Sequence, residues 1–234
     1  MLSKGDDYPI HQTPEPIAYV AGQRNFYDRY FFNGYALGVY PYLDVMDAAF
    51  SFVFDGVQHN VLASKVMGLE RLDLTIGPLS LEVVEPLQTL RIACDDQESG
   101  VKADLTFHAF IPAHEEPRFT RRVGSQLMMD VTRMMQNGTW SGWVEVDGVR
   151  HDVQPGAFQG TRDRSWGLRT VGVPDAQPNP AATGFQFFWI WAPMNFENFS
   201  IHYFVNQDES GEAWNENGVL VPKYGGGDVP HRLC

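Results

Sequence analysis

Residues 101–111 read VKADLTFHAFI, and this stretch decides the fold class. Apolar side chains occupy every second position from Val101 to Ile111, with polar residues such as Lys102 and Asp104 between them. Successive side chains of a β-strand point to opposite faces, so this period predicts a strand with one buried face and one wet face. Strands of this kind are typical of antiparallel sheets.

The same period recurs elsewhere, and turn signals separate the repeats. Residues 50–54, 71–76 and 79–83 each alternate in the same way. Asp55-Gly56 and Asp147-Gly148 lie between strand-like segments, where Asp-Gly favours a two-residue hairpin because it readily adopts positive φ. Further hairpin tips are expected at Ser99-Gly100, Asn137-Gly138 and Ser210-Gly211. The sequence therefore predicts an all-β, antiparallel protein of the barrel or sandwich class.

Three segments depart from this regular pattern. Residues 127–135 carry apolar side chains at helical spacing, but the strand-like segment that follows favours a strand. Residues 1–34 mix prolines with aromatic residues and are predicted to form an irregular segment packed over the barrel. A turn-rich stretch near residue 152 divides the chain into units of residues 1–152 and 153–234. The second unit is short for a closed barrel, so we expect either a truncated chain or a need for a partner, such as a second copy in a homo-oligomer.

Composition narrows the classes of function. The formal charge of −12 argues against a nucleic-acid partner and against an anionic membrane surface, since both require a basic face. No apolar run is long enough to cross a bilayer, so no stable membrane insertion is expected. The N-terminus has no signal-peptide pattern, and the two cysteines are too few for a disulfide framework, which together predict a cytoplasmic protein. No motif indicates a cofactor, and no spacing indicates a metal site.

The stretch GTRDRSWGLR, residues 160–169, is the most informative for function. In a strand, Arg162, Arg164 and Trp166 would share one face, and Asp163 would lie on the other. One interpretation is a structural ion-pair cluster at a sheet edge with Trp166 in the core. The other is a ligand site, because an Arg–Trp pair that faces aromatic residues forms an apolar pocket with a few fixed polar groups.

Aromatic residues follow downstream in period-two register. In residues 184–191, four large aromatic side chains share one face, and Trp189 and Trp191 are the last two of them. If this face and the face of Trp166 both point inward, the rings line one apolar cavity with Arg164 at its polar end. The expected occupant is a hydrophobic small molecule.

The run TRDRSWG, residues 161–167, resembles the Asp-His-x-Trp-Gly signature of the carotenoid 1,2-hydratase (hydroxyneurosporene synthase) superfamily. Residues 115–122 and 132–143 are similar to an uncharacterised bacterial branch of that superfamily. The resemblance covers nearly the whole chain. It implies two lipocalin-like β units in tandem, the second lacking its final strands because members are usually longer. Of the signature's side chains that could take part in chemistry, only Asp163 and Trp166 match, whereas Arg164 stands at the histidine position and cannot act as a general acid near neutral pH.

Two functions follow. The first is a hydratase, a hydro-lyase that acts on a C=C bond of a terpenoid, steroid or polyene-like substrate. In it Asp163 and Trp166 are the catalytic candidates. Substrate binding is assigned to Arg164, Arg169, Trp189 and Trp191. The alternative is a non-catalytic carrier or sensor of a hydrophobic small molecule, in which Arg164 or Arg169 anchors a polar head.

Overall fold

The computed structural model describes residues 2–9, 24–123, 126–169, 188–225 and 231–232. Two short 3₁₀ helices and sixteen strands lie in these ranges, and no α-helix occurs within them. The elements are η1 Lys4–Asp7, β1 Phe26–Phe32, β2 Tyr35–Tyr40, η2 Pro41–Leu43, β3 Val45–Phe54, β4 Val57–Val66, β5 Thr75–Ile76, β6 Leu79–Glu85, β7 Thr89–Asp96, β8 Val101–Ala109, β9 His114–Glu115, β10 Phe119–Val123, β11 Gln126–Val146, β12 Val149–Arg169, β13 Phe188–Asn195, β14 Phe199–Gln207, β15 Ala213–Pro222 and β16 His231–Arg232.

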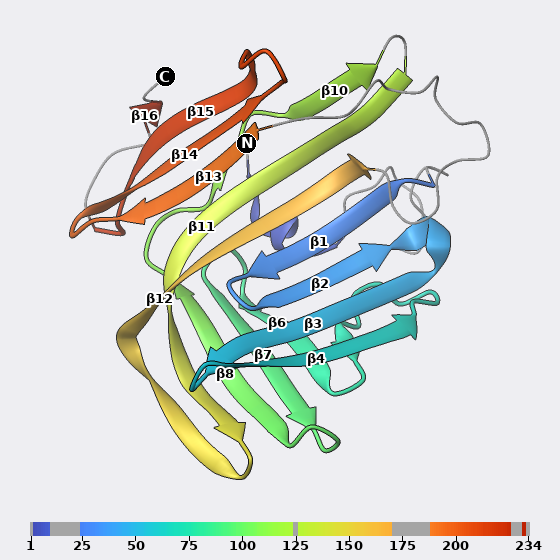
Figure 1. Cartoon of the computed structure of the whole chain (residues 1–234), viewed down its shortest axis with the longest axis vertical. Helices are drawn as coiled ribbons and strands as arrows, with labels where there is room; N and C mark the ends of the chain where they lie inside the picture. The colour runs from blue at the N-terminus through green and yellow to red at the C-terminus, as the bar shows by residue number, and fades with distance from the viewer. Residues whose placement is uncertain (1, 10–23, 124–125, 170–187, 226–230, 233–234) are drawn as a thin grey trace.

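These strands form two antiparallel sheets (Figure 1). The large sheet has the order β4-β3-β2-β1-β12-β11-β8-β7-β6-β5, and β9 and β10 also pair with β11. The small sheet has the order β13-β14-β15-β16. The prediction of an all-β, antiparallel fold is confirmed. Across the described ranges, no helix has the length and apolar character needed to cross a membrane.

The large sheet curls so that its two edges approach each other. Lys65 of β4 donates a hydrogen bond of 2.8 Å to the carbonyl of Asp73, in the segment before β5. The curl encloses the main apolar core, in which the rings of Phe32 and Phe107 lie 5.6 Å apart and those of Phe32 and Trp140 lie 5.4 Å apart. Val101 and the alternate residues up to Phe107 are buried in it, as the period of residues 101–111 predicts.

Most of the expected hairpin tips are turns. Asp55-Gly56 joins β3 to β4 and Asp147-Gly148 joins β11 to β12, and all four residues have positive φ. Ser99-Gly100 and Ser210-Gly211 also lie in turns. The tip expected at Asn137-Gly138 is wrong, because both residues lie inside β11. A glycine is needed there for another reason, since a Cβ on Gly138 would lie 2.3 Å from the carbonyl oxygen of His108 on β8.

Long strands at the centre of the large sheet account for the other departures. Residues 127–135 lie in β11, so the strand interpretation holds and the helical one is wrong. Part of the segment expected to be irregular is also a strand, because β1 pairs with both β2 and β12. Strand β12 runs without a break through residues 152 and 153. The division into two lipocalin-like units therefore stays a prediction, and the chain passes from the large sheet to the small one between Arg169 and Phe188.

Two polar contacts join the small sheet to β9 and β11. His202 of β14 lies 3.0 Å from His114 of β9, measured between Nδ1 and Nε2, and both side chains are buried. Asn137 of β11 donates a 2.6 Å hydrogen bond to Asn195 of β13. The small sheet therefore faces the side of the large sheet that is turned away from its core.

Candidate functional site

Strand β12 separates its polar residues onto two faces, as the sequence predicts. Arg162 lies on the core side, with its guanidinium carbon 5.9 Å from the ring centre of Phe107. Asp163 lies on the other side, among the residues that line a cavity facing the small sheet. The side-chain alternation of the strand therefore assigns neighbouring residues of one motif to two different environments.

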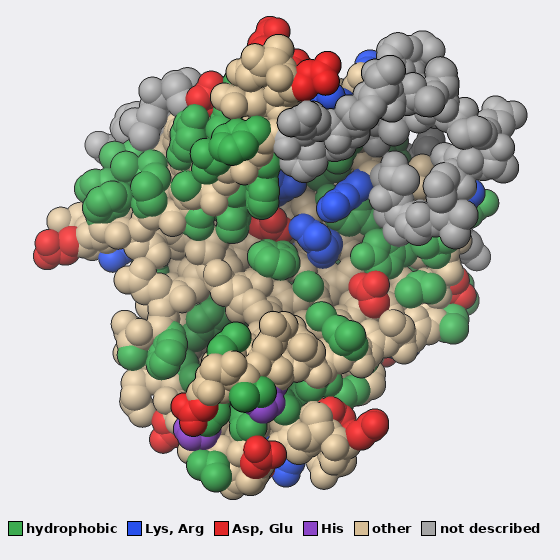
Figure 2. Space-filling view, viewed as in Figure 1, with side chains coloured by type: hydrophobic (Ala, Val, Ile, Leu, Met, Phe, Trp, Pro, Cys, Tyr) green, Lys and Arg blue, Asp and Glu red, His purple; other side chains and the backbone are tan. Residues whose placement is uncertain are grey.

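The cavity between the two sheets has a volume of about 660 Å³, within the range of small-molecule sites. Its floor comes from β1, β10, β11 and β12, and its other wall from β13, β14 and β15. Figure 2 shows basic side chains gathered in a hollow near the middle of the molecule, where β1, β11 and β12 run in Figure 1. The lining residues fall into a charged or amide group and an aromatic group, joined by two aliphatic side chains of β11. They are Arg29, Asn33, Arg121, Arg133, Asp163, Arg169 and Asn206; Tyr27, Phe31, Phe119, Trp189, Trp191 and Trp214; and Met129 and Val131.

Asp163 is the only carboxylate among these lining residues. Two guanidiniums flank it: Nη2 of Arg29 lies 3.9 Å from Oδ1, and Nε of Arg133 lies 4.0 Å from Oδ2. Both distances are too long for a hydrogen bond. Burial raises the pKa of Asp163, while the charges of Arg133, Arg29 and Arg169 offset part of that rise. The cavity therefore contains a carboxyl group that is protonated more easily than usual.

A second carboxyl, that of Glu116, lies directly behind the cavity wall. The side chain is buried, Nη1 of Arg133 donates a 3.4 Å hydrogen bond to its Oε2, and Nε1 of Trp191 donates one of 3.4 Å to its Oε1. Burial raises the pKa of Glu116 to about 7, with Arg133 lowering it and Asp163 raising it further. Arg133 thus lies between two carboxyl groups, one of which changes charge near neutral pH.

Sequence reasoning missed Glu116. It lies in the short segment between β9 and β10, where no alternation indicates burial, and glutamate is rarely buried. The only signal was its place in residues 115–122, which carry part of the family resemblance.

The aromatic wall comes mainly from the small sheet. Trp189 and Trp191 share a face of β13, as the period-two spacing predicts, and Trp189 keeps 51% of its surface exposed. Trp214 of β15 packs edge-on against Phe119 of β10, with ring centres 4.8 Å apart. Phe185 and Phe187, which the sequence placed on the face of Trp189 and Trp191, lie outside the described residues. The cavity thus offers indole faces opposite a charged floor.

Several buried polar atoms at this cavity have no hydrogen-bond partner within the described parts of the chain. They are Nε of Arg29, Nε of Arg133, Oδ1 of Asp163, Nδ2 of Asn206 and Nε1 of Trp214. Unpaired buried polar groups are few in native proteins, because each costs about 1–3 kcal/mol. Their concentration at one cavity indicates a place where a bound molecule or water completes the hydrogen bonding.

The structure does not bring Arg164 and Trp166 to this cavity, contrary to the expected convergence. Arg164 is fully buried on the core side of β12, where it forms an ion pair with Asp28 and lies 3.9 Å from the ring centre of Tyr30. Burial lowers its pKa to about 9. Trp166 lies on that same side, 5.9 Å from the Arg164 guanidinium. The convergence fails because the cavity lies outside the curl of the large sheet, so residues at odd positions of β12 reach it and those at even positions do not.

The structural ion-pair interpretation therefore fits Arg162 and Arg164, but the expected place at a sheet edge is wrong, because β12 lies between β1 and β11 inside the large sheet. Nη1 of Arg162 donates a 2.6 Å hydrogen bond to the buried carboxylate of Asp7, and its Nε donates one of 2.9 Å to Gln136. This network holds η1 against the core. Asp163, Arg169, Trp189 and Trp191 are the predicted site residues that do meet at one cavity.

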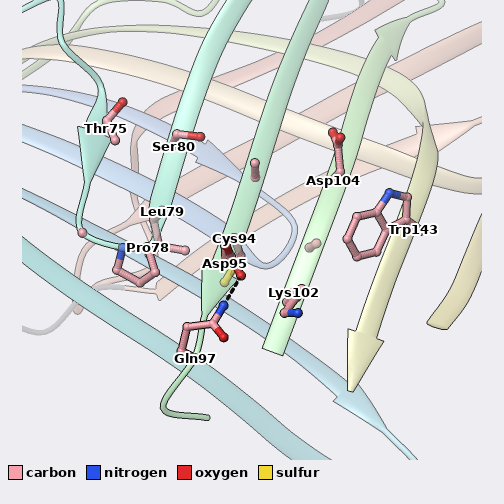
Figure 3. Close-up of a pocket in the computed structure, with 13 residues that line it drawn as sticks. Thr75, Pro78, Leu79, Ser80, Cys94, Asp95, Gln97, Lys102, Asp104 and Trp143 are labelled. Atoms are coloured by element: carbon pink, nitrogen blue, oxygen red, sulfur yellow. Dashed lines mark hydrogen bonds between the residues drawn. The ribbon is translucent and has the colours of Figure 1, made fainter. Parts of the chain in front are cut away.

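A second hollow, on the outer face of β6 to β8, is a weaker candidate (Figure 3). Its volume is about 400 Å³, and Trp143 and Asp104 lie at one side of it. Its polar groups already pair with neighbours, since Asp104 accepts two 2.7 Å hydrogen bonds from Arg91 and Gln97 donates one of 2.6 Å to Asp95. In the described ranges, no group of three or more His, Cys, Asp or Glu side chains could hold a metal ion.

Comparison with known proteins assigns the chain to a family. The profile of a family of unknown function, DUF8625, matches residues 2–232. The chain belongs to DUF8625. Among curated proteins, no sequence matches this DUF8625 chain.

Solved structures with the same architecture include an AttH-like protein from Nitrosomonas europaea. It is 11% identical, with a TM-score of 0.54, and the match covers 83% of the DUF8625 chain and 65% of that protein. Kievitone hydratase from Nectria haematococca also matches, with 15% identity, a TM-score of 0.47, and coverage of 90% of this chain and 65% of the hydratase. The DUF8625 chain thus spans about two thirds of the length of each. The likeness to the AttH-like protein shows a shared fold, whereas nothing in these comparisons confirms membership of the carotenoid 1,2-hydratase family.

Proposed function

We propose that the cavity between the two sheets binds a hydrophobic small molecule and that Asp163 transfers a proton to it in a hydratase reaction. The observation that supports this most is the position of Asp163. It is a carboxyl of raised pKa that lines an aromatic cavity. A proton donor needs both contact with the substrate and a pKa close to the working pH.

Hydration of a C=C bond needs an acid, a surface that stabilises a cation, and a water molecule, and the lining residues supply the first two. The carboxylic acid of Asp163 gives its proton to one carbon of the double bond, which leaves a cation on the other carbon. Indole faces of Trp189 and Trp191 stabilise that cation through cation–π attraction. Water then adds to the cationic carbon and returns a proton to the Asp163 carboxylate. The products balance as one alkene and one water giving one alcohol, and the acid is regenerated.

Arg133 and Glu116 regulate the protonation of Asp163 in this scheme. When Glu116 is protonated, the charge of Arg133 has Asp163 as its nearest carboxylate and favours the ionised form of Asp163. When Glu116 is ionised, it shares that charge, and its own repulsion disfavours ionisation of Asp163. Ionisation of Glu116 therefore favours the protonated form of Asp163, which is the form that donates a proton in the hydratase reaction. Trp166 has no part in the scheme, because it lies on the core side of β12.

The second candidate is a non-catalytic carrier or sensor. The three arginines near Asp163 favour this function, since each lowers the pKa of Asp163. If the combined charge of these arginines keeps Asp163 ionised when a ligand is bound, the cavity binds the ligand without catalysing a reaction. Of the two arginines predicted to anchor a polar head, Arg169 lines the cavity and Arg164 does not.

Binding and turnover together test the proposal. Terpenoid, steroid and polyene probes are titrated into the protein by calorimetry, and incorporation of ¹⁸O from labelled water is followed by mass spectrometry. Trp191→Ala should weaken binding at least about tenfold, and Asp163→Asn should lower turnover by about 10²-fold or more while binding persists. Trp143→Ala and Asp152→Asn are matched controls. Trp143 lies at the second hollow and not at the cavity, and Asp152 is exposed on β12, the strand of Asp163.

The outcomes separate the two functions. Binding with label incorporation that Asp163→Asn abolishes supports the hydratase. Binding without incorporation for any probe supports the carrier and removes the catalytic part. If no probe binds the folded protein, the proposal as a whole is wrong.

A further inference from the structure

We infer that the molecule bound between the two sheets is an amphiphile with an anionic head, whose oxyanion lies between Arg29, Arg133 and Arg169 and whose apolar body lies against the tryptophans of the small sheet. This inference rests on the proposed binding function of the same cavity and specifies the class of ligand.

The balance of charge at the cavity is the first argument. Three arginines, Arg29, Arg133 and Arg169, lie near Asp163, the one carboxylate among the lining residues, and Glu116 pairs with Arg133 behind the wall. The chain as a whole has the opposite balance, with 29 acidic and 17 basic residues. A local excess of positive charge in an acidic protein attracts an anion to that place and away from the rest of the surface. An anionic head group would offset this local excess, and a neutral hydrocarbon would not.

The hydrogen-bonding state of the arginines is the second argument. Nε of Arg29 and Nε of Arg133 are buried and have no acceptor within the described residues. Asp163 does not satisfy them, because its oxygens lie 3.9 and 4.0 Å from the nearest guanidinium nitrogens. Arg169 lines the same cavity and forms no ion pair with any described residue. A carboxylate or phosphate accepts two parallel hydrogen bonds from a guanidinium, so an oxyanion fits these open donors.

The aromatic rings hold the guanidiniums ready for a ligand. The guanidinium carbon of Arg29 lies 5.5 Å from the ring centre of Phe31, and that of Arg133 lies 5.4 Å from the ring centre of Phe119. A guanidinium that stacks on a ring keeps its N–H groups in the plane and free to donate. The strands beneath are central in the large sheet, so the donors are fixed before a ligand arrives.

The remaining wall is mainly aromatic and determines the rest of the ligand. Trp189, Trp191 and Trp214 bring indole rings to the cavity. A bare inorganic anion would use the arginines and leave this wall in water, whereas an amphiphile uses both surfaces. A volume of about 660 Å³ accommodates a drug-sized molecule and not only its head group.

The experiment uses pairs of probes that differ only in the head: retinoic acid and retinol, and pyrenebutanoic acid and pyrenebutanol. Affinities for the full chain are measured by calorimetry, with inorganic phosphate as a third arm. Each acid should bind at least about tenfold more tightly than its alcohol, and this ratio should shrink in high salt, because salt screens the charge interaction. Inorganic phosphate should bind more weakly than either acid, because it makes no contact with the indole rings.

Variants identify the arginines responsible. Arg29→Gln and Arg169→Gln should each reduce the acid-to-alcohol ratio at least about threefold with little effect on the alcohol. Arg150→Gln, which removes the same charge from an exposed position on β12, the strand of Arg169, is the matched control. Neither test position is fully buried, so the variants should fold, and circular dichroism checks this.

Each result has one meaning. Equal binding of acids and alcohols overturns the inference and leaves the proposed binding function intact. The inference is also overturned if the acids bind more tightly but Arg29→Gln and Arg150→Gln change the acid-to-alcohol ratio equally. The charge at this cavity would then not be the cause of the preference for acids. Binding of phosphate as tight as that of the acids contradicts the amphiphile. If no hydrophobic probe binds at all, the proposed function fails together with the inference.

Discussion

Glu116→Gln should make the stability of the protein less dependent on pH, and the structure gives the sign and size of the effect. The side chain is 3% exposed, and its carboxyl has a pKa of about 7 in place of the ordinary 4.5. Between these two values the folded chain holds a proton at Glu116 that the unfolded chain has lost. Folding stability therefore falls as pH rises through this window and is lowest above pH 7.

The magnitude follows from the two pKa values. A pKa difference of one is equivalent to about 1.4 kcal/mol. Between pH 5 and pH 8 the Glu116 carboxyl should cost the wild-type protein about 2.5 kcal/mol of stability. Glutamine has the shape of the protonated acid, but it has no proton to lose between pH 5 and pH 8. The free energy of unfolding of Glu116→Gln, relative to wild type, should therefore increase by about 2.5 kcal/mol from pH 5 to pH 8.

Urea unfolding followed by circular dichroism measures this difference at intervals across the range. Titrating groups that do not interact with Glu116 affect both proteins alike and cancel, whereas Asp163 is coupled to it. Glu115→Gln is the matched control, since it removes one acidic side chain at the neighbouring, exposed position. A difference between Glu116→Gln and wild type that stays constant from pH 5 to pH 8 would show that Glu116 does not titrate in this window, and the description of the charges behind the cavity would be wrong.

Three further predictions concern the core, the contact between the sheets, and the site. Trp140→Ala should cost roughly 3–5 kcal/mol in urea unfolding, because the ring is buried against Phe107, and a loss no larger than that of a surface variant would contradict this. Burial lowers the pKa of His202 and of His114, so both stay neutral in the folded chain and take up protons in the unfolded chain as pH falls from 7 to 4. His202→Asn should therefore lose less stability than wild type over this range. An unchanged dependence of unfolding free energy on pH would show that His202 is not held neutral by burial. Retinoic acid should bind more tightly as pH falls through about 7, because Glu116 becomes neutral there and no longer shares the charge of Arg133. In calorimetry, Glu116→Gln should abolish this pH dependence of the affinity. A pH dependence that persists in the variant would show that Glu116 is not its origin.

Local patterns in the sequence predict the strands and most of the turns. The alternation in residues 101–111 survives in β8 because one face of that strand meets the core and the other meets water. Asp55-Gly56 and Asp147-Gly148 are turns because their positive φ values suit a tight hairpin. Asn137-Gly138 carries the same kind of signal for a different reason, the close approach of β8 to Gly138. No local pattern distinguishes these two needs for glycine.

The candidate site is predictable only in part, because its position depends on how the two sheets meet. Alternation correctly places Asp163 opposite Arg164, but it does not say which face the small sheet covers. A cavity inside a barrel would contain Arg164 and Trp166, whereas the observed cavity lies outside the curl of the large sheet. Arg29 and Arg133 join the site through pairing of β1, β11 and β12, which brings together residues far apart in the chain. Contacts between distant segments of this kind leave no trace in the local period.

We place the ligand site between the two sheets, and a crystal structure with the tightest-binding probe is the sharpest test of this placement. We expect density for the probe between β12 and β13, in contact with Asp163 and Trp191. Its polar end should lie within hydrogen-bonding distance of Arg29 or Arg133. Density inside the curl of the large sheet beside Arg164, or in the second hollow over β6 to β8 beside Trp143, would contradict this placement.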